Sequence, residues 1–168
     1  YTSTRRMPLI ICANSSGSRL TLNISFKINK NQIVGILGPN GCGKTTTIGM
    51  ILGLLKPTKG RVLIDGFEIE KKRVYLLNNL NFISPYIELP KKLTVKQNLE
   101  VYGRLYDIKN LNTKIDYLSE KLRLNEIIYK VTGELSSGQK NRVSLAKSII
   151  NDPTVLLLDE PTASLDPE

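Results

Sequence analysis

Apolar side chains recur at two different spacings in the first third of the chain. Residues 20–28 place an apolar side chain at every second position, which predicts a strand with one buried face. Residues 33–37 form a short apolar run (Ile-Val-Gly-Ile-Leu), typical of a central strand in a parallel sheet. A glycine-rich loop follows. Apolar residues at helical spacing from 48 to 55 then predict a helix, which we expect Pro57 and Gly60 to end.

The middle of the chain predicts a hairpin, a strand and a capped helix. Residues 61–69 contain an Asp-Gly pair between two apolar runs, which favours a two-residue hairpin turn. Residues 80–84 predict a further strand. A helix is expected to start at Thr94, because Gln97 lies at the spacing of a capping-box partner.

The last third predicts short helices, a second capped helix and a buried strand. Helical pieces are expected at residues 115–122 and 124–128. Ser136 predicts another helix start, with Gln139 as its capping-box partner. Residues 154–158 are almost wholly apolar, which predicts a strand buried on both faces.

Strands and helices therefore alternate at both ends of the chain around a helical block. This order predicts an α/β domain with a mostly parallel core sheet and an inserted helical lobe. We expect residues 1–168 to form a single, incomplete domain and residues 93–133 to form the lobe.

Composition and charge narrow the functional classes without selecting one. The chain has 168 residues, a formal net charge of +9 and no histidine. A solvated lysine-rich surface explains this charge, and a surface near acidic lipid headgroups or a phosphate ligand is the alternative. Basic residues are scattered and not interleaved with aromatic ones, which disfavours nucleic-acid binding.

Three further features concern the location and the ends of the chain. It contains no run of about 20 apolar residues that could cross a bilayer, and no signal peptide. Cys12 and Cys42 lack metal-ligand spacing, and a reducing cytoplasm fits them best. The chain begins with Tyr1 and ends in Asp-Pro-Glu, which is typical of a helix start, so we expect it to be cut at both ends.

Residues 38–45, Gly-Pro-Asn-Gly-Cys-Gly-Lys-Thr, match the phosphate-binding pattern G-x-x-x-x-G-K-[ST]. Glycines let backbone N–H groups surround phosphate oxygens, and the next helix points its positive end at the same anion. Lys44 is expected to reach the β- and γ-phosphates of ATP, and Thr45 to ligate Mg²⁺. A chance glycine-rich turn is the alternative, and the rarity of the string disfavours it. The residues expected to bind nucleotide are Gly38, Pro39, Asn40, Gly41, Cys42, Gly43, Lys44, Thr45 and Thr46.

The strand predicted at 154–158 ends in two adjacent acids, Asp159 and Glu160. Ligands of α/β sheets bind at the carboxyl ends of the strands. Asp159 is expected to hold Mg²⁺. Glu160 is expected to orient the attacking water, and is catalytic together with Lys44. Solvated loop acids would explain the pair by itself, but the P-loop upstream favours the functional interpretation.

Five segments of this chain, in order, resemble the ATP-binding cassette (ABC) family. The resemblance extends from about residue 20 to the end, and its most specific part is Leu-Ser-Ser-Gly-Gln at 135–139. That string is similar to the family's signature L-S-G-G-Q, with Ser137 in place of one glycine. The five segments are residues 38–45, residues 135–139, the apolar strand with Asp159 and Glu160, Pro161-Thr162, and Ser164-Leu165-Asp166.

The resemblance implies a P-loop NTPase fold with an N-terminal antiparallel β portion. It also implies that two cassettes pair head to tail on ATP binding, so that the signature of one caps the γ-phosphate bound by the other. A helix start at the signature is itself suited to an anion, although an ordinary capped helix is the alternative. Residues 164–166 resemble the D-loop, which lines the dimer interface in the family. The signature residues expected to act in trans are Ser136, Ser137, Gly138 and Gln139.

Three features of the family are missing or displaced here. The switch histidine lies downstream of the D-loop, where this sequence ends. The Q-loop glutamine is absent from the expected place, so Ser84 is the candidate for that position, while Gln97 is explained as a helix cap. No aromatic residue is available to stack on adenine, so Ile11 or Cys12 would offer only apolar contacts.

Three functional hypotheses follow from these residues. The first is an exporter-like ABC transporter subunit that hydrolyses ATP for a separate membrane permease, peripheral on the cytoplasmic face of the cell membrane. The second is a soluble ABC ATPase acting on ribosomes or DNA. Such relatives carry two cassettes or a long coiled-coil insertion, and no sustained heptads occur here. The third is a nucleotide-binding module without turnover, which Glu160 disfavours.

Overall fold

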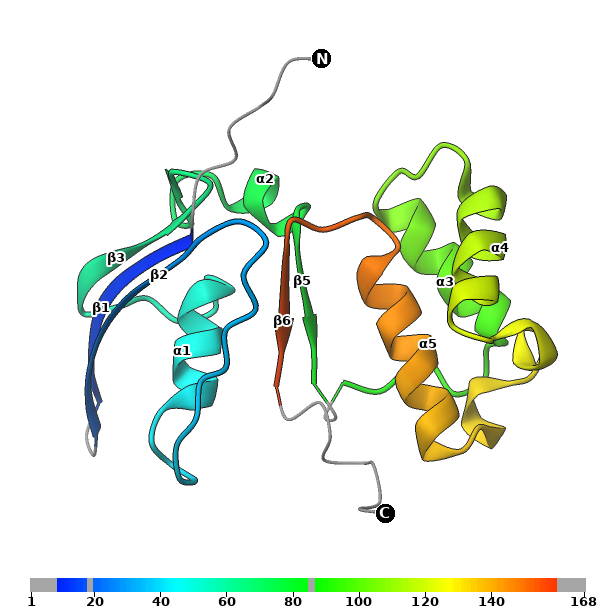
Figure 1. Ribbon diagram of the computed structural model, residues 1–168, viewed down its shortest axis with the longest axis horizontal. Coiled ribbons are helices and arrows are strands. Elements are labelled where there is room, and N and C mark those ends of the chain that lie inside the picture. Colours follow the sequence, from blue (N-terminus) through cyan, green and yellow to red (C-terminus); the bar gives the residue numbers. More distant parts are fainter. Residues whose placement is uncertain (1–8, 18–19, 85–86, 160–168) are drawn as a thin grey trace. The chain divides into compact units, whose positions relative to one another are not determined.

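The computed structural model of the chain describes residues 9–17, 20–84 and 87–159. It divides into two compact units, residues 1–77 and residues 78–168. Each unit has its own sheet and its own helices (Figure 1). The α/β composition predicted from the sequence is confirmed, with the antiparallel strands in the first unit and a parallel pair in the second.

The first unit is built on a four-stranded antiparallel sheet with strand order β2-β1-β3-β4. The strand predicted at 20–28 is confirmed as β2, and the predicted hairpin is confirmed as β3 and β4. Asp65 and Gly66 in its turn both have positive φ angles, 50° and 81°, as such a turn requires. The strands are β1 (Leu9–Gly17), β2 (Leu20–Ile28), β3 (Lys59–Ile64) and β4 (Phe67–Glu68).

The two faces of this sheet differ in polarity. Val62 and Ile64 on β3 are buried, 2% and 1% exposed. Along β2, every second residue from Ile24 to Ile28 is half-buried, whereas Ser25 and Lys27 between them are exposed. This alternation follows from the pleat, which points successive side chains to opposite faces. The pattern predicted for residues 20–28 therefore gives the sheet one apolar and one polar face.

Helix α1 (Lys44–Ile51) contributes buried apolar residues to the first unit and lies on the concave side of the sheet (Figure 1). The sequence predicted a helix continuing to residue 55, but α1 ends at Ile51. Gly53 ends the helix with a φ of 64°, and the N–H groups of Leu54 and Leu55 both bond to Gly49 O. The short helix α2 (Arg73–Leu77) was not predicted.

The strand predicted at residues 33–37 is wrong. These residues have no regular secondary structure, and Ile33 and Leu37 are fully or almost fully exposed, at 104% and 94%. A parallel strand forms only where neighbouring strands accept and donate its backbone hydrogen bonds. In the described part of the first unit, no strand pairs with this run, so its backbone has no neighbouring strand with which to form the hydrogen bonds of a sheet.

The second unit combines a two-stranded parallel sheet with three longer helices. The strand predicted at 80–84 and the helices predicted to start at Thr94 and Ser136 are confirmed. The helix expected at 115–122 begins earlier, and the piece at 124–128 is a 3₁₀ turn. The elements are β5 (Leu80–Ile83), α3 (Val95–Leu105), α4 (Leu111–Lys121), the 3₁₀ turns Asn125–Ile127 and Thr132–Glu134, α5 (Ser137–Ile149) and β6 (Val155–Leu158).

Strand β6 is less buried than its sequence predicts. Val155, Leu156 and Leu157 are half-buried, and Leu158 is 48% exposed. The prediction that both faces are covered is therefore wrong for this structure. The physical reason is that, in the described part of its unit, β6 has one neighbouring strand, β5, and the opposite edge is not covered by another strand.

One apolar cluster joins the three helices of the second unit. Its central residues are at most 2% exposed, and each large apolar side chain buried in this way stabilises the fold by roughly 1.5–3 kcal/mol. The predicted lobe helices α3 and α4 thus pack together with α5, whose start carries the signature string. The central residues are Val95, Leu99, Ile115, Leu118, Leu124, Val143, Ala146 and Ile150.

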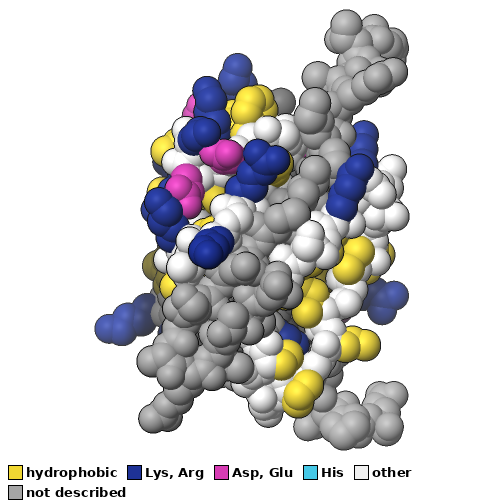
Figure 2. Space-filling model, turned by 90° about the vertical axis from the view of Figure 1, so that its left-hand side faces the viewer, with side chains coloured by type: hydrophobic (Ala, Val, Ile, Leu, Met, Phe, Trp, Pro, Cys, Tyr) yellow, Lys and Arg dark blue, Asp and Glu magenta, His cyan; other side chains and the backbone are white. Residues whose placement is uncertain are grey.

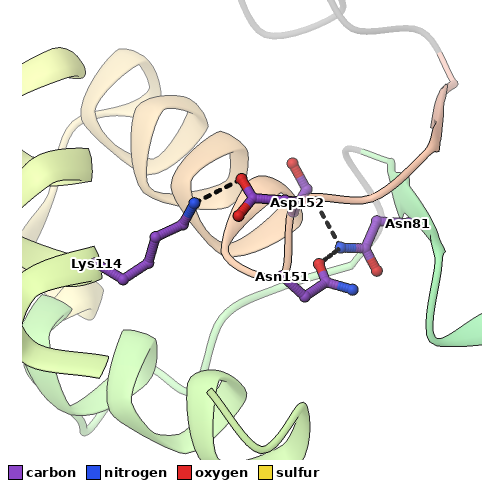
Figure 3. Close-up of polar contacts among 5 residues, drawn as sticks. Asn81, Lys114, Asn151 and Asp152 are labelled. Atoms are coloured by element: carbon purple, nitrogen blue, oxygen red, sulfur yellow. Dashed lines mark hydrogen bonds and ion pairs between the residues drawn. The ribbon is translucent and has the colours of Figure 1, made fainter. Parts of the chain in front are cut away.

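A polar network fastens the end of α5 to β5 and α4 (Figure 3). The Asn81 side-chain amide on β5 donates to Asn151 Oδ1 at 2.6 Å, and Tyr106 O–H donates to Asn81 Oδ1 at 2.8 Å. Lys114 on α4 pairs with Asp152 at 2.6 Å. These bonds hold together the strand and the helix on which the site residues of this unit lie.

Candidate nucleotide-binding site

Glycines shape the loop that precedes α1. Gly41 and Gly43 have φ angles of 81° and 98°, which residues with a side chain rarely adopt. Gly43 is also the N-cap residue of α1, so no side chain caps this helix. At Gly38, an added Cβ would lie 2.5 Å from Cys42 Sγ. The three glycines of the predicted P-loop are therefore each required by its conformation or its packing.

Lys44 folds back across the loop from the first position of α1. Its Nζ donates to Gly38 O at 2.7 Å and to Pro39 O at 3.0 Å. The same ammonium lies 4.0 Å from Cys42 Sγ. The positive charge is thus held against the loop, at the place where the sequence pattern predicts phosphate oxygens.

The first turn of α1 leaves backbone donors free. Thr47 N bonds to Gly43 O at 2.9 Å, and the Thr47 hydroxyl donates to the same oxygen at 2.9 Å. The N–H groups of Lys44, Thr45 and Thr46 have no acceptor among the described residues. Free donors at the positive end of a helix, beside a lysine, form a site for an anion such as phosphate.

Asp159 lies at the carboxyl end of β6, next to β5. Ile83 pairs with Leu158 in the parallel ladder, and Asp159 N donates to Ile83 O at 2.9 Å. Asp159 and Ser84, the residues that follow this pair, are both 8% exposed. Sheet pairing therefore brings the predicted Mg²⁺ ligand to the same edge as the residue predicted for the Q-loop position.

The donor chemistry of Thr45 and Asp159 fits Mg²⁺. This ion prefers oxygen ligands, and it uses one or two protein side chains together with phosphate oxygens and water. The Thr45 residue is exposed, and the buried Asp159 carboxylate has no ion pair with a cation among the described residues. The two residues belong to different units, each described by itself.

The signature string starts α5 with a complete capping box. Ser136 Oγ accepts from Gln139 N at 3.3 Å, and Gln139 Oε1 accepts from Ser136 N at 3.0 Å. Leu135 is 4% exposed and anchors the string, whereas Ser136 and Ser137 are exposed. An added Cβ at Gly138 would meet no atom within 4 Å. The start of α5 is thus an open helix terminus with space in front of Gly138.

Sequence reasoning missed one feature of these loops. Cys42 was expected to bind nucleotide, but its sulfur also contacts Lys44 and fills the space that makes Gly38 necessary. Nothing in the sequence gave a signal for this contact. The capping box predicted for Ser136 and Gln139 is confirmed.

Several predicted residues lie outside the described ranges. These are Glu160, Pro161-Thr162 and the D-loop-like residues 164–166. Ile11 and Cys12 are placed on β1, and only their backbone is described. Among the described residues, no helix has the length and apolar character of a membrane span.

Comparison with known families decides among the ATPase classes that share a P-loop. The sequence profile of the family described as ABC transporter matches residues 21–163. The chain belongs to the ABC transporter family. As the match includes both the P-loop and the 135–139 string, the resemblance inferred from the five segments is confirmed.

Relatives and solved structures agree with this membership of the ABC transporter family. The chain is 38% identical over 149 residues to the multidrug ABC transporter ATP-binding protein YbhF of Escherichia coli, covering 88% of this chain and 26% of that protein. It is 35% identical to the ABC transporter ATP-binding protein NatA of Bacillus subtilis, covering 86% and 60%. It therefore spans between about a quarter and three fifths of the length of these relatives.

A solved ABC transporter ATP-binding protein from Pyrococcus furiosus superposes with a TM-score of 0.81 and 31% identity, covering 95% of this chain and 78% of that one. A solved ATP-binding subunit of an ABC transporter superposes with a TM-score of 0.83 at 22% identity, covering 96% and 69%. These likenesses confirm the predicted fold of an ABC ATPase P-loop domain.

Proposed function

We propose that this chain binds and hydrolyses ATP as the energising part of an ABC transporter. The observation that carries the proposal is the start of α1, where Lys44 bonds to the loop of residues 38–43 and three backbone N–H groups have no acceptor among the described residues. Such a site suits a triphosphate, since it combines backbone donors, a helix terminus and a lysine ammonium group.

Each predicted residue has a distinct task in this proposal. Lys44 exchanges its bonds to the loop carbonyls for bonds to the β- and γ-phosphates of the substrate. Glu160 orients the attacking water, because phosphoryl transfer needs chiefly positioning and charge neutralisation. Thr45 and Asp159 hold Mg²⁺, which neutralises phosphate charge when it is bound.

We further propose that two copies, or this chain and a paired cassette, close head to tail around ATP. Each P-loop would then face Ser136, Ser137 and Gly138 of the other copy. The exposed start of α5, with no atom within 4 Å of an added Cβ at Gly138, supports a close approach of phosphate to that backbone.

A separate membrane permease completes the proposed assembly, with this chain peripheral on the cytoplasmic face of the membrane. The names of relatives refer to multidrug transport in Escherichia coli and to Nod factor export in Burkholderia lata and Rhizobium johnstonii. These names support a transport role of the export type. The permease selects the transported substrate in this proposal, so the chain itself does not define it.

Cys42 provides a direct test of nucleotide binding, because its thiol is half-exposed inside the loop. In a Cys12→Ser background, the rate at which a maleimide labels Cys42 is measured with and without MgATP. We expect saturating MgATP to slow labelling at least tenfold, and Lys44→Ala to remove this protection. Labelling that ignores MgATP in the otherwise unchanged protein would contradict the proposed site.

Turnover is tested separately with Glu160→Gln. This variant should still show protection of Cys42 by MgATP, and should accumulate as a dimer on size-exclusion chromatography with MgATP. Its release of inorganic phosphate should fall to background. Undiminished phosphate release would remove Glu160 from the role proposed here. Protection without any phosphate release by the unaltered protein would favour a binding module instead of an ATPase.

A further inference from the structure

The net positive charge of this protein lies in one of its two units. Residues 1–77 contain 12 Lys and Arg but only 3 Asp and Glu, whereas residues 78–168 contain 12 of each. The whole formal charge of +9 therefore belongs to the first unit, and the second is neutral. Solubility alone does not require such a segregation, since it depends on the total charge.

Strand register gathers much of this charge on one face of the first unit's sheet. Residue 10 on β1 pairs with Lys27 on one side, and residue 12 pairs with Arg61 on the other. Lys59 lies two residues before Arg61, so all three side chains belong to the same polar face. All three residues are exposed. Figure 2, which views the sheet from the side away from α1, shows more Lys and Arg than Asp and Glu side chains among the described residues.

The acidic residue of this face leaves most of its positive charge uncompensated. Glu68 on β4 pairs with Lys71 at 2.7 Å. The hydrogen bond from Lys71 holds the pKa of Glu68 below its usual value, with a smaller contribution from the charge of Arg61. Among the described residues, neither Lys27 nor Lys59 forms an ion pair. We call these five residues the basic face: Lys27, Lys59, Arg61, Lys71 and Glu68.

Exposed apolar side chains also occur at the β4–α2 end of the unit. Val74 is 77% exposed, Tyr75 is 55% exposed and Phe67 is 45% exposed. The rings of Phe67 and Tyr75 meet edge to face at 6.0 Å. Phe67 pairs with Ile64, so its side chain belongs to the face of the sheet opposite the cations. Attraction of a ligand by the basic face therefore depends on its charge.

We propose that the basic face binds directly to the anionic headgroups of a membrane surface. The sheet presents its cations over an open surface, and this extended array matches the extended layer of phosphates in a membrane. A single nucleic-acid strand is disfavoured, because none of the basic-face residues is aromatic and none of them can therefore stack on a base. This inference goes beyond the proposed function, as it requires neither ATP nor a permease.

The test is sedimentation of the purified protein with vesicles of phosphatidylcholine containing 0 or about 30% phosphatidylglycerol. We expect binding only to the anionic vesicles, weakening as salt rises. In Lys27→Glu/Lys59→Glu/Arg61→Glu, the affinity should fall by roughly 100-fold, since each surface cation contributes about a factor of five. Because all three residues are exposed on the polar face, the variant should fold, which its MgATP protection of Cys42 checks.

A matched control separates the basic face from net charge. Lys92→Glu/Lys109→Glu/Lys130→Glu changes the charge by the same amount with exposed lysines of the neutral unit. We expect this control to keep most of its vesicle affinity. Equal losses in both triple variants would overturn the proposal in favour of nonspecific attraction.

Two other outcomes would also overturn the proposal. One is the absence of binding to anionic vesicles while MgATP still protects Cys42, which would leave the proposed ATPase untouched. The other is tighter binding of a 20-nucleotide RNA than of anionic vesicles, with that RNA affinity lost in the basic-face variant. If the triple glutamate variant misfolds, Lys27→Gln/Lys59→Gln/Arg61→Gln serves as a milder variant. We expect its loss of affinity for anionic vesicles to be smaller but still selective.

Discussion

Each unit contains a helix whose start is assigned to phosphate. The two helix starts differ in whether a side chain already caps their backbone N–H groups. Helix α1 begins after Gly43, which has no side chain to cap it, and Lys44 covers the loop instead. Helix α5 begins after Ser136, which forms a complete capping box with Gln139. The first start is incomplete without a ligand, and the second is complete by itself.

This difference assigns different roles to the two helix starts. At α1, free donors and a neighbouring cation supply most of the attraction for an anion, so binding energy should concentrate there. At α5 the cap already uses one backbone donor of the first turn, and no lysine is present in the string. We infer that α5 recognises a phosphate that is already bound elsewhere, which is the arrangement proposed for the paired cassettes.

The largest expected effect comes from the cation at α1. Lys44→Ala should lower the rate of ATP hydrolysis by on the order of 10²–10³-fold, as expected for loss of one charge-stabilising donor. Steady-state phosphate release measures this. Lys30→Ala is the control, because Lys30 is an exposed lysine outside the loop. If Lys44→Ala hydrolyses ATP as fast as this control, the lysine has no role in turnover.

The next largest effect concerns the backbone at Gly43. Gly43→Ala places a side chain at a φ of 98°, which should reduce the free energy of unfolding by about 1–2 kcal/mol. Protection of Cys42 by MgATP should be lost as well. Urea denaturation measures the stability. Gly35→Ala is the matched control, because no atom lies within 4 Å of its added Cβ and its φ is not positive, so its stability should not fall.

Local signals predicted the helix starts and the hairpin better than the strands. The capping boxes at Thr94 and Ser136 and the Asp65-Gly66 turn depend on residues within four positions of each other, so the sequence specifies them directly. The apolar run 33–37 predicted a strand, but a strand depends on partners far along the chain, and the described part of its unit provides none. Strand β1 was missed because its residues lack a regular alternation.

The candidate site divides in the same way. Gly43 and Lys44 could be assigned from the P-loop pattern because the pattern itself encodes the loop conformation. The contact between Cys42 and Gly38 could not, since only the folded loop brings the sulfur over that glycine. The pairing of Ile83 with Leu158, which brings Ser84 beside Asp159, joins residues 75 positions apart and needs the sheet.

A smaller effect is expected at the cap of α5. Ser136→Ala removes the acceptor of the Gln139 N–H, and should lower the free energy of unfolding of the second unit by about 1 kcal/mol. Thermal or urea denaturation measures it. Ser137→Ala is the control, because Ser137 is exposed and takes no part in the capping box. Equal stability of the two variants would show that the cap does not hold the helix start.

The smallest expected change in stability has the opposite sign and is the most informative about α5. Gly138→Ala adds a Cβ to a helical residue with no atom within 4 Å, so the free energy of unfolding should rise by about 0.5 kcal/mol. ATP hydrolysis should nevertheless fall, because in the proposed head-to-tail dimer the methyl group would occupy the space through which the phosphate held by the other copy approaches.

Gly103→Ala in α3 is the contrasting control, because its added Cβ would collide with Leu111 Cδ1 and destabilise the unit instead. A Gly138→Ala variant that is more stable and hydrolyses ATP at the original rate would separate α5 from the catalytic dimer. A variant that gains stability and loses turnover, while MgATP still protects Cys42, would support the proposal that the open end of α5 acts on ATP held by another copy.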